Sequence, residues 1–238
     1  MRRAVAAALA LAATLPPVAG AQQAGEVQVV GRSVLGRPIG VQAIGDPAAT
    51  STMLVVGCVH GDECAGRAVV ARLREGPERV PPGVRLLLVR NANPDGLVRG
   101  TRQNARGVDL NRNAAEGWRD LGPRGARFHA GRRAFSEPET RALRALILLA
   151  RPDLTVWYHQ PLGLVDLPET GSIAPSRRYA DLTGLPVQRL RAYPGSLSRW
   201  QNARVRAGSA FVVELPGGRL RARDAERHAA AVLALTTS

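Results

Sequence analysis

The residues with the clearest chemical potential are His60 and Glu63, which follow an apolar run. Residues 52–63 read Thr-Met-Leu-Val-Val-Gly-Cys-Val-His-Gly-Asp-Glu, which predicts a buried strand that ends in a turn. An imidazole and a carboxylate three residues apart, where a strand stops and a helix starts, can converge on one cation because Gly61 lets the backbone turn tightly. The pair predicts two ligands of a zinc site, but this short motif occurs often by chance and needs a third ligand.

Two later strands also end in side chains that could do chemistry. The predicted strand 154–158 leads into His159, and the predicted strand 210–214 ends in Glu214. Carboxyl ends of parallel strands meet at one edge of a sheet, where ligands gather. Together with the first pair, these residues give two imidazoles and one carboxylate for a catalytic zinc ion, with a water in the fourth position, and leave one carboxylate as a base.

The elements that must position these residues alternate between strand and helix. This alternation predicts one α/β domain with a central mixed, mostly parallel, twisted sheet flanked by helices. The expected elements are a hairpin of 27–31 and 37–44 at the sheet edge, a helix over 63–75, a strand over 84–90, a helix from the Ser136-Glu-Pro-Glu139 start to about Ala150, a helix over 175–183, a short strand over 187–192 and a last helix over 223–234.

The segment between the second and third long strands is polar and irregular. Asn93-Pro-Asp-Gly96 predicts a turn, and an arginine-rich loop follows up to Asn113. A long polar loop close to a metal motif indicates a functional surface. His129 is interpreted as a loop histidine, and His228 is expected on the exposed face of the last helix.

The N-terminus predicts export. Residues 1–21 have a charged start, an apolar run and a small-residue cleavage site after Ala21, as a secretory signal peptide does. The apolar run is shorter than the roughly 18–20 residues that span a bilayer, which disfavours a membrane anchor, and no lipidation cysteine follows. We therefore expect residues 22–238 to form a soluble, monomeric protein in the periplasm or outside the cell.

The charge of the chain argues against one class of function, nucleic-acid binding. The formal net charge is +14, every basic residue is Arg, and the arginines are scattered among only three Phe, three Tyr and three Trp. This pattern disfavours nucleic-acid binding, although a basic exported protein is attracted to anionic polymers such as the cell wall.

The two cysteines, Cys58 and Cys64, flank the zinc motif. They could form a disulfide or remain as two free thiols, and we favour the free thiols.

The motifs resemble the zinc carboxypeptidases of the carboxypeptidase A type, and more closely their compact bacterial branch, which includes murein peptide amidases. The resemblance covers residues 37–218, most of the chain after the signal region. It is carried by His60-Gly-Asp-Glu63, Asn93-Pro-Asp-Gly96, Arg99-Gly-Thr-Arg102, Gly107-Val-Asp-Leu-Asn-Arg-Asn113, Ser136-Glu-Pro-Glu139, His159, Pro194-Gly-Ser-Leu-Ser-Arg-Trp200 and Phe211-Val-Val-Glu214.

The resemblance implies a role for each matching residue. It implies that His60, Glu63 and His159 bind one Zn²⁺, that Glu214 is the general base, that Arg102 stabilises the oxyanion, that Asn111 and Arg112 grip the free carboxylate of the substrate, that Asp109 orients the proton of His60, and that Tyr193 covers the substrate. Arg199 departs from the family pattern: it could bind an acidic or zwitterionic group of the substrate, as on diaminopimelate, or point into solvent. These implications point to a hydrolase acting on an amide beside a free carboxylate, with cell-wall peptides such as γ-D-glutamyl-diaminopimelate as the favoured substrate.

Three alternatives stay open. One is a general C-terminal carboxypeptidase, and another is a deacylase of N-acyl amino acids, which is a related zinc fold. The third, from a different class, is a catalytically silent peptidoglycan-binding protein that has kept the fold. The presence of ligands, base and arginines together favours the enzyme.

Overall fold

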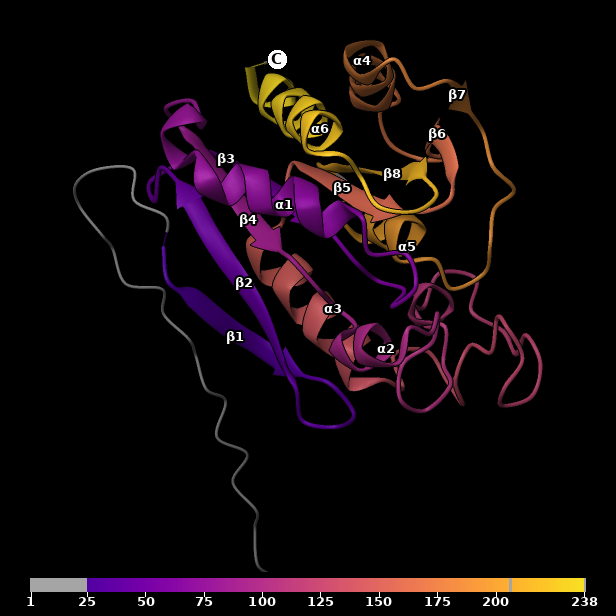
Figure 1. Ribbon diagram of the computed structural model, residues 1–238. Helices are drawn as coiled ribbons and strands as arrows, with labels where there is room; N and C mark the ends of the chain where they lie inside the picture. Colours follow the sequence, from indigo (N-terminus) through magenta and orange to yellow (C-terminus); the bar gives the residue numbers. More distant parts are fainter. Residues whose placement is uncertain (1–24, 206, 238) are drawn as a thin grey trace, which may run out of the picture.

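The fold is a single α/β domain built on a mixed sheet (Figure 1). The computed structural model describes residues 25–205 and 207–237, so the expected signal peptide over 1–21 lies outside the described residues. In this described part the sheet has eight strands, β1 (Val27–Arg32), β2 (Pro38–Gly45), β3 (Ser51–Val56), β4 (Val84–Val89), β5 (Leu154–His159), β6 (Leu162–Asp166), β7 (Val187–Gln188) and β8 (Ser209–Pro216), in the order β1-β2-β4-β3-β5-β8-β6-β7.

Helices cover both faces of the sheet. They are α1 (Gly66–Glu75), α2 (Pro94–Arg99), α3 (Pro138–Ala150), α4 (Ala174–Thr183), α5 (Leu197–Arg204) and α6 (Ala222–Ala234), with short 3₁₀ turns at Pro77–Arg79, Leu110–Arg112 and Leu235–Thr237. Apolar residues of α1, α4 and α6 pack on one face, and those of α3 and α5 pack on the other (Figure 1). The core therefore has two apolar layers, one on each side of the sheet.

The centre of the sheet is parallel, as the sequence predicts. Strands β4, β3, β5 and β8 are parallel neighbours, whereas β1 and β2 form an antiparallel hairpin at the edge. Strand β5 is buried along its whole length, which matches its continuous apolar sequence. In the register of β5 and β8, His159 lies directly opposite Glu214, so two of the predicted site residues are neighbours across one strand pair.

Several boundaries differ from the sequence-based expectation. Strand β3 ends at Val56, four residues before His60, and α1 starts only at Gly66. The predicted turn at Asn93–Gly96 is instead the start of α2, because the Asn93 side chain accepts a hydrogen bond from the Gly96 amide and caps the helix. Strand β6 and helix α5 were not predicted, and the expected strand over 187–192 is reduced to Val187–Gln188.

The expectation for His228 is wrong. His228 is 1% exposed, on the face of α6 that packs against the sheet. Its Nδ1 lies 2.7 Å from the Tyr179 hydroxyl, which lies 2.8 Å from the Tyr158 hydroxyl. A polar histidine can occupy the core because this hydrogen bond satisfies its ring nitrogen. His129, by contrast, lies in a loop as expected, with its Nδ1 2.8 Å from the Gly122 carbonyl.

The expectation of two free thiols is also wrong. Cys58 and Cys64 form a disulfide, with their Cα atoms 4.7 Å apart. The backbone turns back on itself between strand β3 and helix α1, which brings the two Cα atoms to a separation that suits a disulfide. His60 and Glu63 lie inside the small loop that the disulfide closes.

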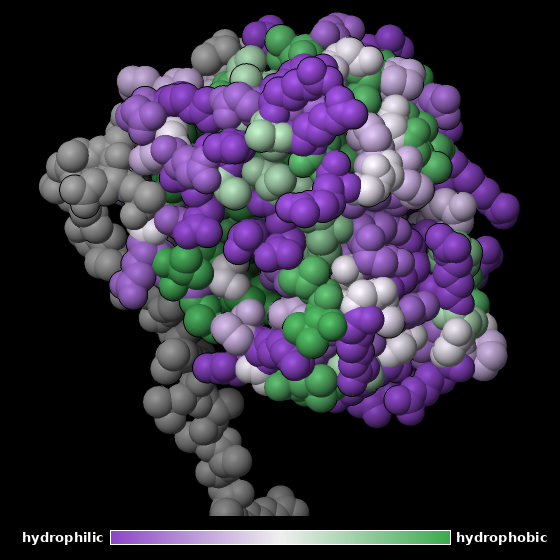
Figure 2. All heavy atoms as spheres, viewed as in Figure 1, coloured by the Kyte–Doolittle hydropathy of each residue, from purple (hydrophilic) through white to green (hydrophobic). Residues whose placement is uncertain are grey.

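The face of the molecule drawn in Figure 2 is mainly hydrophilic. Hydrophilic side chains spread over the face seen in Figure 2, and the hydrophobic ones stand in small groups among them. Within residues 25–205 and 207–237, none of the helices has the length and apolar character needed to cross a membrane.

Candidate active site

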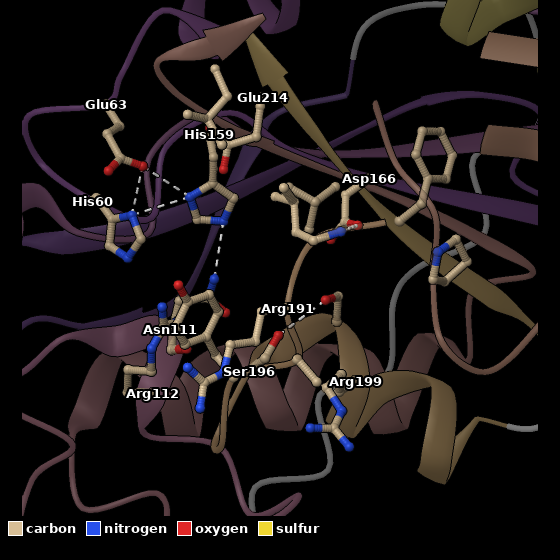
Figure 3. Close-up of a pocket in the computed structure, with 18 of the residues that line it drawn as sticks. His60, Glu63, Asn111, Arg112, His159, Asp166, Arg191, Ser196, Arg199 and Glu214 are labelled. Atoms are coloured by element: carbon tan, nitrogen blue, oxygen red, sulfur yellow. Dashed lines mark hydrogen bonds and ion pairs between the residues drawn. The ribbon is translucent and has the colours of Figure 1, made fainter. Parts of the chain in front are cut away.

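The predicted metal ligands meet at the carboxyl edge of the parallel strands. Ligand atoms of His60, Glu63 and His159 all lie within 4.8 Å of one another, and all three residues are buried (Figure 3). The Nδ1 atom of His60 is 2.7 Å from Glu63 Oε2, and the Nδ1 atom of His159 is 3.1 Å from the same oxygen. Three donors therefore point at one small volume, from a turn and from a strand end.

The structure requires a glycine at position 61 for a reason other than the tight turn expected from the sequence. A Cβ atom at this position would lie 2.0 Å from the Gly96 carbonyl carbon, so the requirement is a close approach of two backbone segments. This contact packs the start of α2 directly against the turn that carries His60. The polar segment around residues 93–113 is thereby brought to the metal-binding edge.

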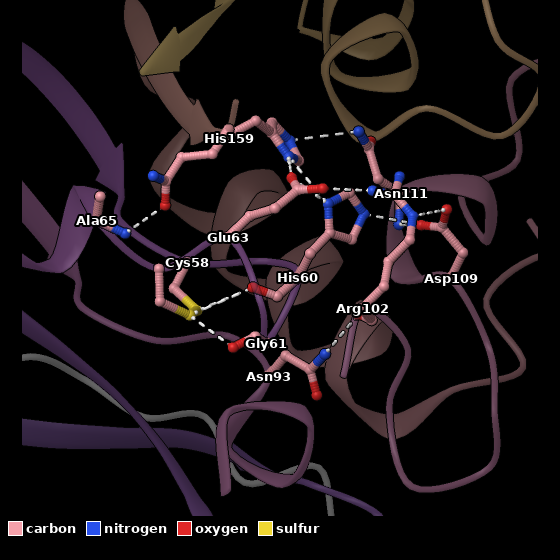
Figure 4. Close-up of polar contacts among 12 residues, drawn as sticks. Cys58, His60, Gly61, Glu63, Ala65, Asn93, Arg102, Asp109, Asn111 and His159 are labelled. Carbon is pink, nitrogen blue, oxygen red and sulfur yellow. Dashed lines mark hydrogen bonds and ion pairs between the residues drawn. A yellow bond between two sulfur atoms is a disulfide. The ribbon is translucent and has the colours of Figure 1, made fainter. Parts of the chain in front are cut away.

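Asp109 links His60 to Arg102 behind the ligand cluster. Its Oδ1 is 2.9 Å from His60 Nε2, and its Oδ2 accepts a hydrogen bond of 2.9 Å from Arg102 Nε (Figure 4). Burial pushes the pKa of Asp109 upward, but the charge and hydrogen bond of His60 and the charge of Arg102 hold it well below its usual range. The ionised carboxylate can accept the Nε2 proton of His60, which leaves Nδ1 as the free donor atom for a cation.

Glu63 and His159 are shifted in ways that suit metal binding. Burial raises the pKa of Glu63, but hydrogen bonds from His159 and His60 outweigh burial and keep this carboxyl ionised. Burial lowers the pKa of His159 to about 4, so its imidazole is neutral at pH 7. A neutral imidazole and an ionised carboxylate are the protonation states that a divalent metal needs.

Glu214 faces the same cavity from strand β8. Burial, and next the negative charge of Glu63, raise its pKa to about 7. Its Oε2 atom is buried and has no hydrogen-bond partner among the residues that the structure describes. A carboxylate with a free lone pair and a pKa near neutrality is suited to accept and return a proton.

Asn111 and Arg112 lie on the opposite wall of the cavity. The side-chain carbonyl of Asn111 accepts a hydrogen bond of 2.9 Å from the Leu197 amide, which turns its NH₂ group toward His159 Nε2 at 3.3 Å. Arg112 is 5% exposed, and its guanidinium lies 4.2 Å from the ring centroid of Tyr193. The 3₁₀ turn of Leu110–Arg112 places both side chains.

The remaining predicted residue, Arg199, lies at the far end of the same cavity. It forms an ion pair of 3.0 Å with Glu169, and both side chains are one-third exposed. The cavity has a volume of about 280 Å³ and also contains Asp166, whose pKa is raised by burial. All predicted site residues except Asp109 line this cavity, and Asp109 lies behind His60.

Among the cavity-lining residues that sequence reasoning missed, three matter for the chemistry of the cavity. They are Asp166 at the end of β6, Glu169 after it, and Phe128 in the irregular segment between Asn113 and α3. Asp166 ends β6, a strand that the sequence did not predict, and Glu169 follows that strand. One feature of the sequence could have indicated Phe128 as a site residue: it is one of only three phenylalanines, and it stands between Arg127 and His129.

The donor set fits a zinc ion. Two imidazole nitrogens and one carboxylate oxygen, with an outer carboxylate on one imidazole, make the combination found in catalytic zinc sites. Among the described residues, His60, Glu63 and His159 form a group that could hold a metal ion.

Comparison with known proteins identifies the family of the chain. It is 32% identical over 200 residues to murein peptide amidase A of Vibrio campbellii, an alignment that covers 78% of this chain and 77% of that protein. It is also 32% identical over 191 residues to murein peptide amidase A of Escherichia coli K12, covering 71% and 74% of the two chains. The chain belongs to the zinc carboxypeptidase family. Within it, the chain falls in the bacterial branch of the murein peptide amidases, and it is a hydrolase.

Solved structures of the zinc carboxypeptidase family agree with the fold. The murein-tripeptide amidase MpaA of Escherichia coli O157 superposes with a TM-score of 0.68 at 29% identity, over 90% of this chain and 92% of that one. Carboxypeptidase A of Helicoverpa armigera superposes with a TM-score of 0.76 at 19% identity, over 90% and 68%. A family model described as the succinylglutamate desuccinylase/aspartoacylase catalytic domain matches residues 49–139, which is less than half of the chain.

Proposed function

We propose that this protein is a zinc-dependent peptidase that hydrolyses an amide bond beside a free carboxylate in murein peptides, such as the γ-D-glutamyl-diaminopimelate bond. One observation carries this proposal. The group of His60, Glu63 and His159 opens into the same cavity as the free carboxylate of Glu214 and the buried guanidinium of Arg112. A cation site, a base and an anion site within one small cavity are the parts that such a reaction needs.

The proposed roles follow from these positions. His60, Glu63 and His159 hold the zinc ion, which when bound supplies Lewis-acid chemistry and makes water more acidic. The carboxylate of Glu214 takes a proton from the attacking water and returns it to the leaving amine. Arg102, fixed by Asp109, donates to the carbonyl oxygen as negative charge develops there.

The other wall of the cavity orients the substrate. Arg112 presents a planar guanidinium that can bind a carboxylate through two parallel hydrogen bonds. The amide of Asn111 donates beside it, and Tyr193 covers the site from a segment that is 40% exposed at this residue. Arg199 with Glu169 and Asp166 gives the far end both signs of charge, which suits a substrate end that carries both signs.

The relatives support murein as the substrate source. Two proteins with murein peptide amidase names align over more than 70% of this chain. The sequence of residues 1–21 supports export, so we propose that the protein acts as a monomer in the periplasm or outside the cell. Its positive charge favours contact with anionic wall polymers.

A second candidate function has one observation in its favour. The model of the succinylglutamate desuccinylase/aspartoacylase domain matches residues 49–139, which include the first two ligands and the arginine loop. That match ends before His159 and Glu214, whereas the murein amidase relatives align over most of the chain. A deacylase of N-acyl amino acids is therefore the rival that the substrate test must include.

A panel of three substrates tests the proposal. The protein is loaded with zinc and given the tripeptide L-alanyl-γ-D-glutamyl-diaminopimelate, an ordinary peptide with a free C-terminus and N-acetylaspartate, and the products are identified by mass spectrometry. We expect release of diaminopimelate at the highest kcat/KM. Preferred cleavage of the ordinary peptide would indicate a general carboxypeptidase, and cleavage of N-acetylaspartate alone would indicate a deacylase. Zinc binding with no turnover of any substrate would indicate a wall-binding protein.

A further inference from the structure

The ring of Phe128, in the lining of the cavity, lies close to three arginine guanidinium groups. The guanidinium carbons of Arg102, Arg112 and Arg127 lie 5.5, 5.1 and 5.6 Å from its centroid. All three distances are within the range in which a cation is attracted to an aromatic face.

Arg112 needs such support because it is a buried cation with few hydrogen bonds. Its NH1 donates to the Asn111 carbonyl at 2.7 Å, and its Nε has no partner among residues 25–205 and 207–237. Burial lowers its pKa and the charges of Asp109 and Glu63 raise it, but both carboxylates form their ion pairs with Arg102. Two aromatic faces, those of Phe128 and Tyr193, add the attraction of an aromatic ring for a cation.

Phe128 lies beside two like charges, those of Arg102 and Arg112. Arg102 is pinned by hydrogen bonds to Asp109 and Glu63, and its positive charge acts on Arg112. A planar guanidinium with a free edge would move away from this charge unless a surface held it in place. The shared ring gives Arg112 such a surface and fixes its distance from Arg102.

The backbone around Phe128 is tied to the site on both sides. The carbonyl of His129 accepts a hydrogen bond of 2.9 Å from the Asp109 amide, and the carbonyl of Arg127 accepts one of 3.0 Å from the Gln103 side chain. Although residues 114–135 form no helix or strand, the position of Phe128 is set by the same loop that carries the site residues. This distinguishes it from Tyr193, which is 40% exposed.

We propose that Phe128 is a positioning residue that holds Arg112 in the orientation needed to bind the free carboxylate of the substrate. This inference rests on the proposed hydrolysis beside a free carboxylate. Phe128 acts through Arg112 and does not touch the reacting atoms, so its loss should weaken carboxylate recognition and leave the chemical step nearly intact.

The kinetic test compares three variants on two substrates. The substrates are a tripeptide with a free carboxylate and the same tripeptide with that carboxylate amidated. Phe128→Leu keeps an apolar side chain but removes the aromatic face, and we expect KM for the free carboxylate to rise about tenfold with little change in kcat. Phe128→Tyr restores an aromatic face, and we expect it to restore KM. The amidated substrate should respond to neither change.

Phe135→Leu is the matched control. Phe135 lies 5.4 Å from the guanidinium carbon of Arg144 and packs edge-on against Trp200, away from the three arginines. We expect this variant to lower the melting temperature without changing the preference for the free carboxylate. If Phe128→Leu leaves KM unchanged, or weakens both substrates equally and Phe128→Tyr does not rescue it, the proposal is overturned.

A structural measurement separates this proposal from the proposed function. Crystal structures of the parent and Phe128→Leu proteins should show the Arg112 guanidinium displaced in the variant, with His60 and Glu63 unmoved. Failure of the parent to cleave the free-carboxylate tripeptide would refute the proposed function. An unmoved Arg112 in the variant would refute the role of Phe128 whatever the substrate is.

Discussion

Glu214→Gln should abolish hydrolysis and at the same time stabilise the metal-free protein at neutral pH. Gln has the shape of Glu but cannot accept a proton, so the step assigned to Glu214 is lost. Removing a general base typically costs 10²–10⁴-fold, and we expect kcat to fall by about 10³-fold. Zinc content should be unchanged because Glu214 is not part of the ligand group.

The stability effect follows from the pKa of Glu214. Burial raises this pKa from 4.5 to about 7. Between these two values the unfolded chain loses its proton while the folded protein keeps it, so stability falls as pH rises from 4.5 to 7 and is level above 7. A shift of this size corresponds to about 3 kcal/mol, and partial exposure of the side chain reduces it to about 1–2 kcal/mol.

The assay is urea unfolding of chelator-treated protein at pH 4 and pH 8. We expect Glu214→Gln to unfold at higher urea than the parent at pH 8 and at the same urea at pH 4. Glu226→Gln is the control, because Glu226 lies on the exposed side of α6, paired with Arg79. Turnover near the parent rate would refute the assignment of Glu214 as the base. If the variant and the parent had the same urea midpoint at pH 8 as well as at pH 4, the raised pKa of Glu214 would be refuted.

Three further predictions test the rest of the site. Arg112→Ala should raise KM for substrates with a free carboxylate far more than for amidated ones, and steady-state kinetics on the pair of tripeptides checks this; equal effects would remove Arg112 from substrate recognition. Asp109→Asn should lower zinc affinity about 10–100-fold in competition with a chelator, because the His60 ring loses its anionic acceptor; the control Asp95→Asn, at a buried carboxylate bound to Arg37, should not. Reduction of the disulfide should lower unfolding stability by roughly 2 kcal/mol for so small a loop, whereas an unchanged urea midpoint would show that it adds nothing.

The position of the ligands could be predicted because it depends on patterns that a sequence carries. Long apolar runs mark buried parallel strands, and a parallel sheet brings their carboxyl ends to one edge. This predicted that His159 and Glu214 lie at one edge of the sheet, and in the structure they face each other across β5 and β8. The turn at His60 was predicted to lie at the strand end, but β3 stops four residues earlier, because residues 57–63 bend back to contact α2 through Gly61.

The parts that were missed depend on contacts between distant segments. Helix α5 has few apolar residues, and Trp200 is buried by packing against residues far away in the sequence, such as Phe135. His228 was expected at the surface because a sequence does not show that Tyr179, 49 residues away, offers it a hydrogen bond. The cysteines lie six residues apart, a separation that allows a disulfide only when the turn between them is known.

Two arginines of the site do different work because their partners differ. Arg102 has its Nε bound to Asp109 and its NH1 bound to Glu63, so its orientation is already set in the folded protein and it can stabilise charge that develops at the metal edge. The charges of Asp109 and Glu63 also act on Arg112, but both carboxylates are paired with Arg102, and the rings of Phe128 and Tyr193 lie against the Arg112 guanidinium. A guanidinium held by rings is oriented but keeps its hydrogen-bonding edge free for a carboxylate that arrives with the substrate. We propose that Arg102 therefore acts as a fixed electrostatic element and Arg112 as a binding group, because the carboxylates of Asp109 and Glu63 are bound to Arg102 and leave Arg112 without a paired acid.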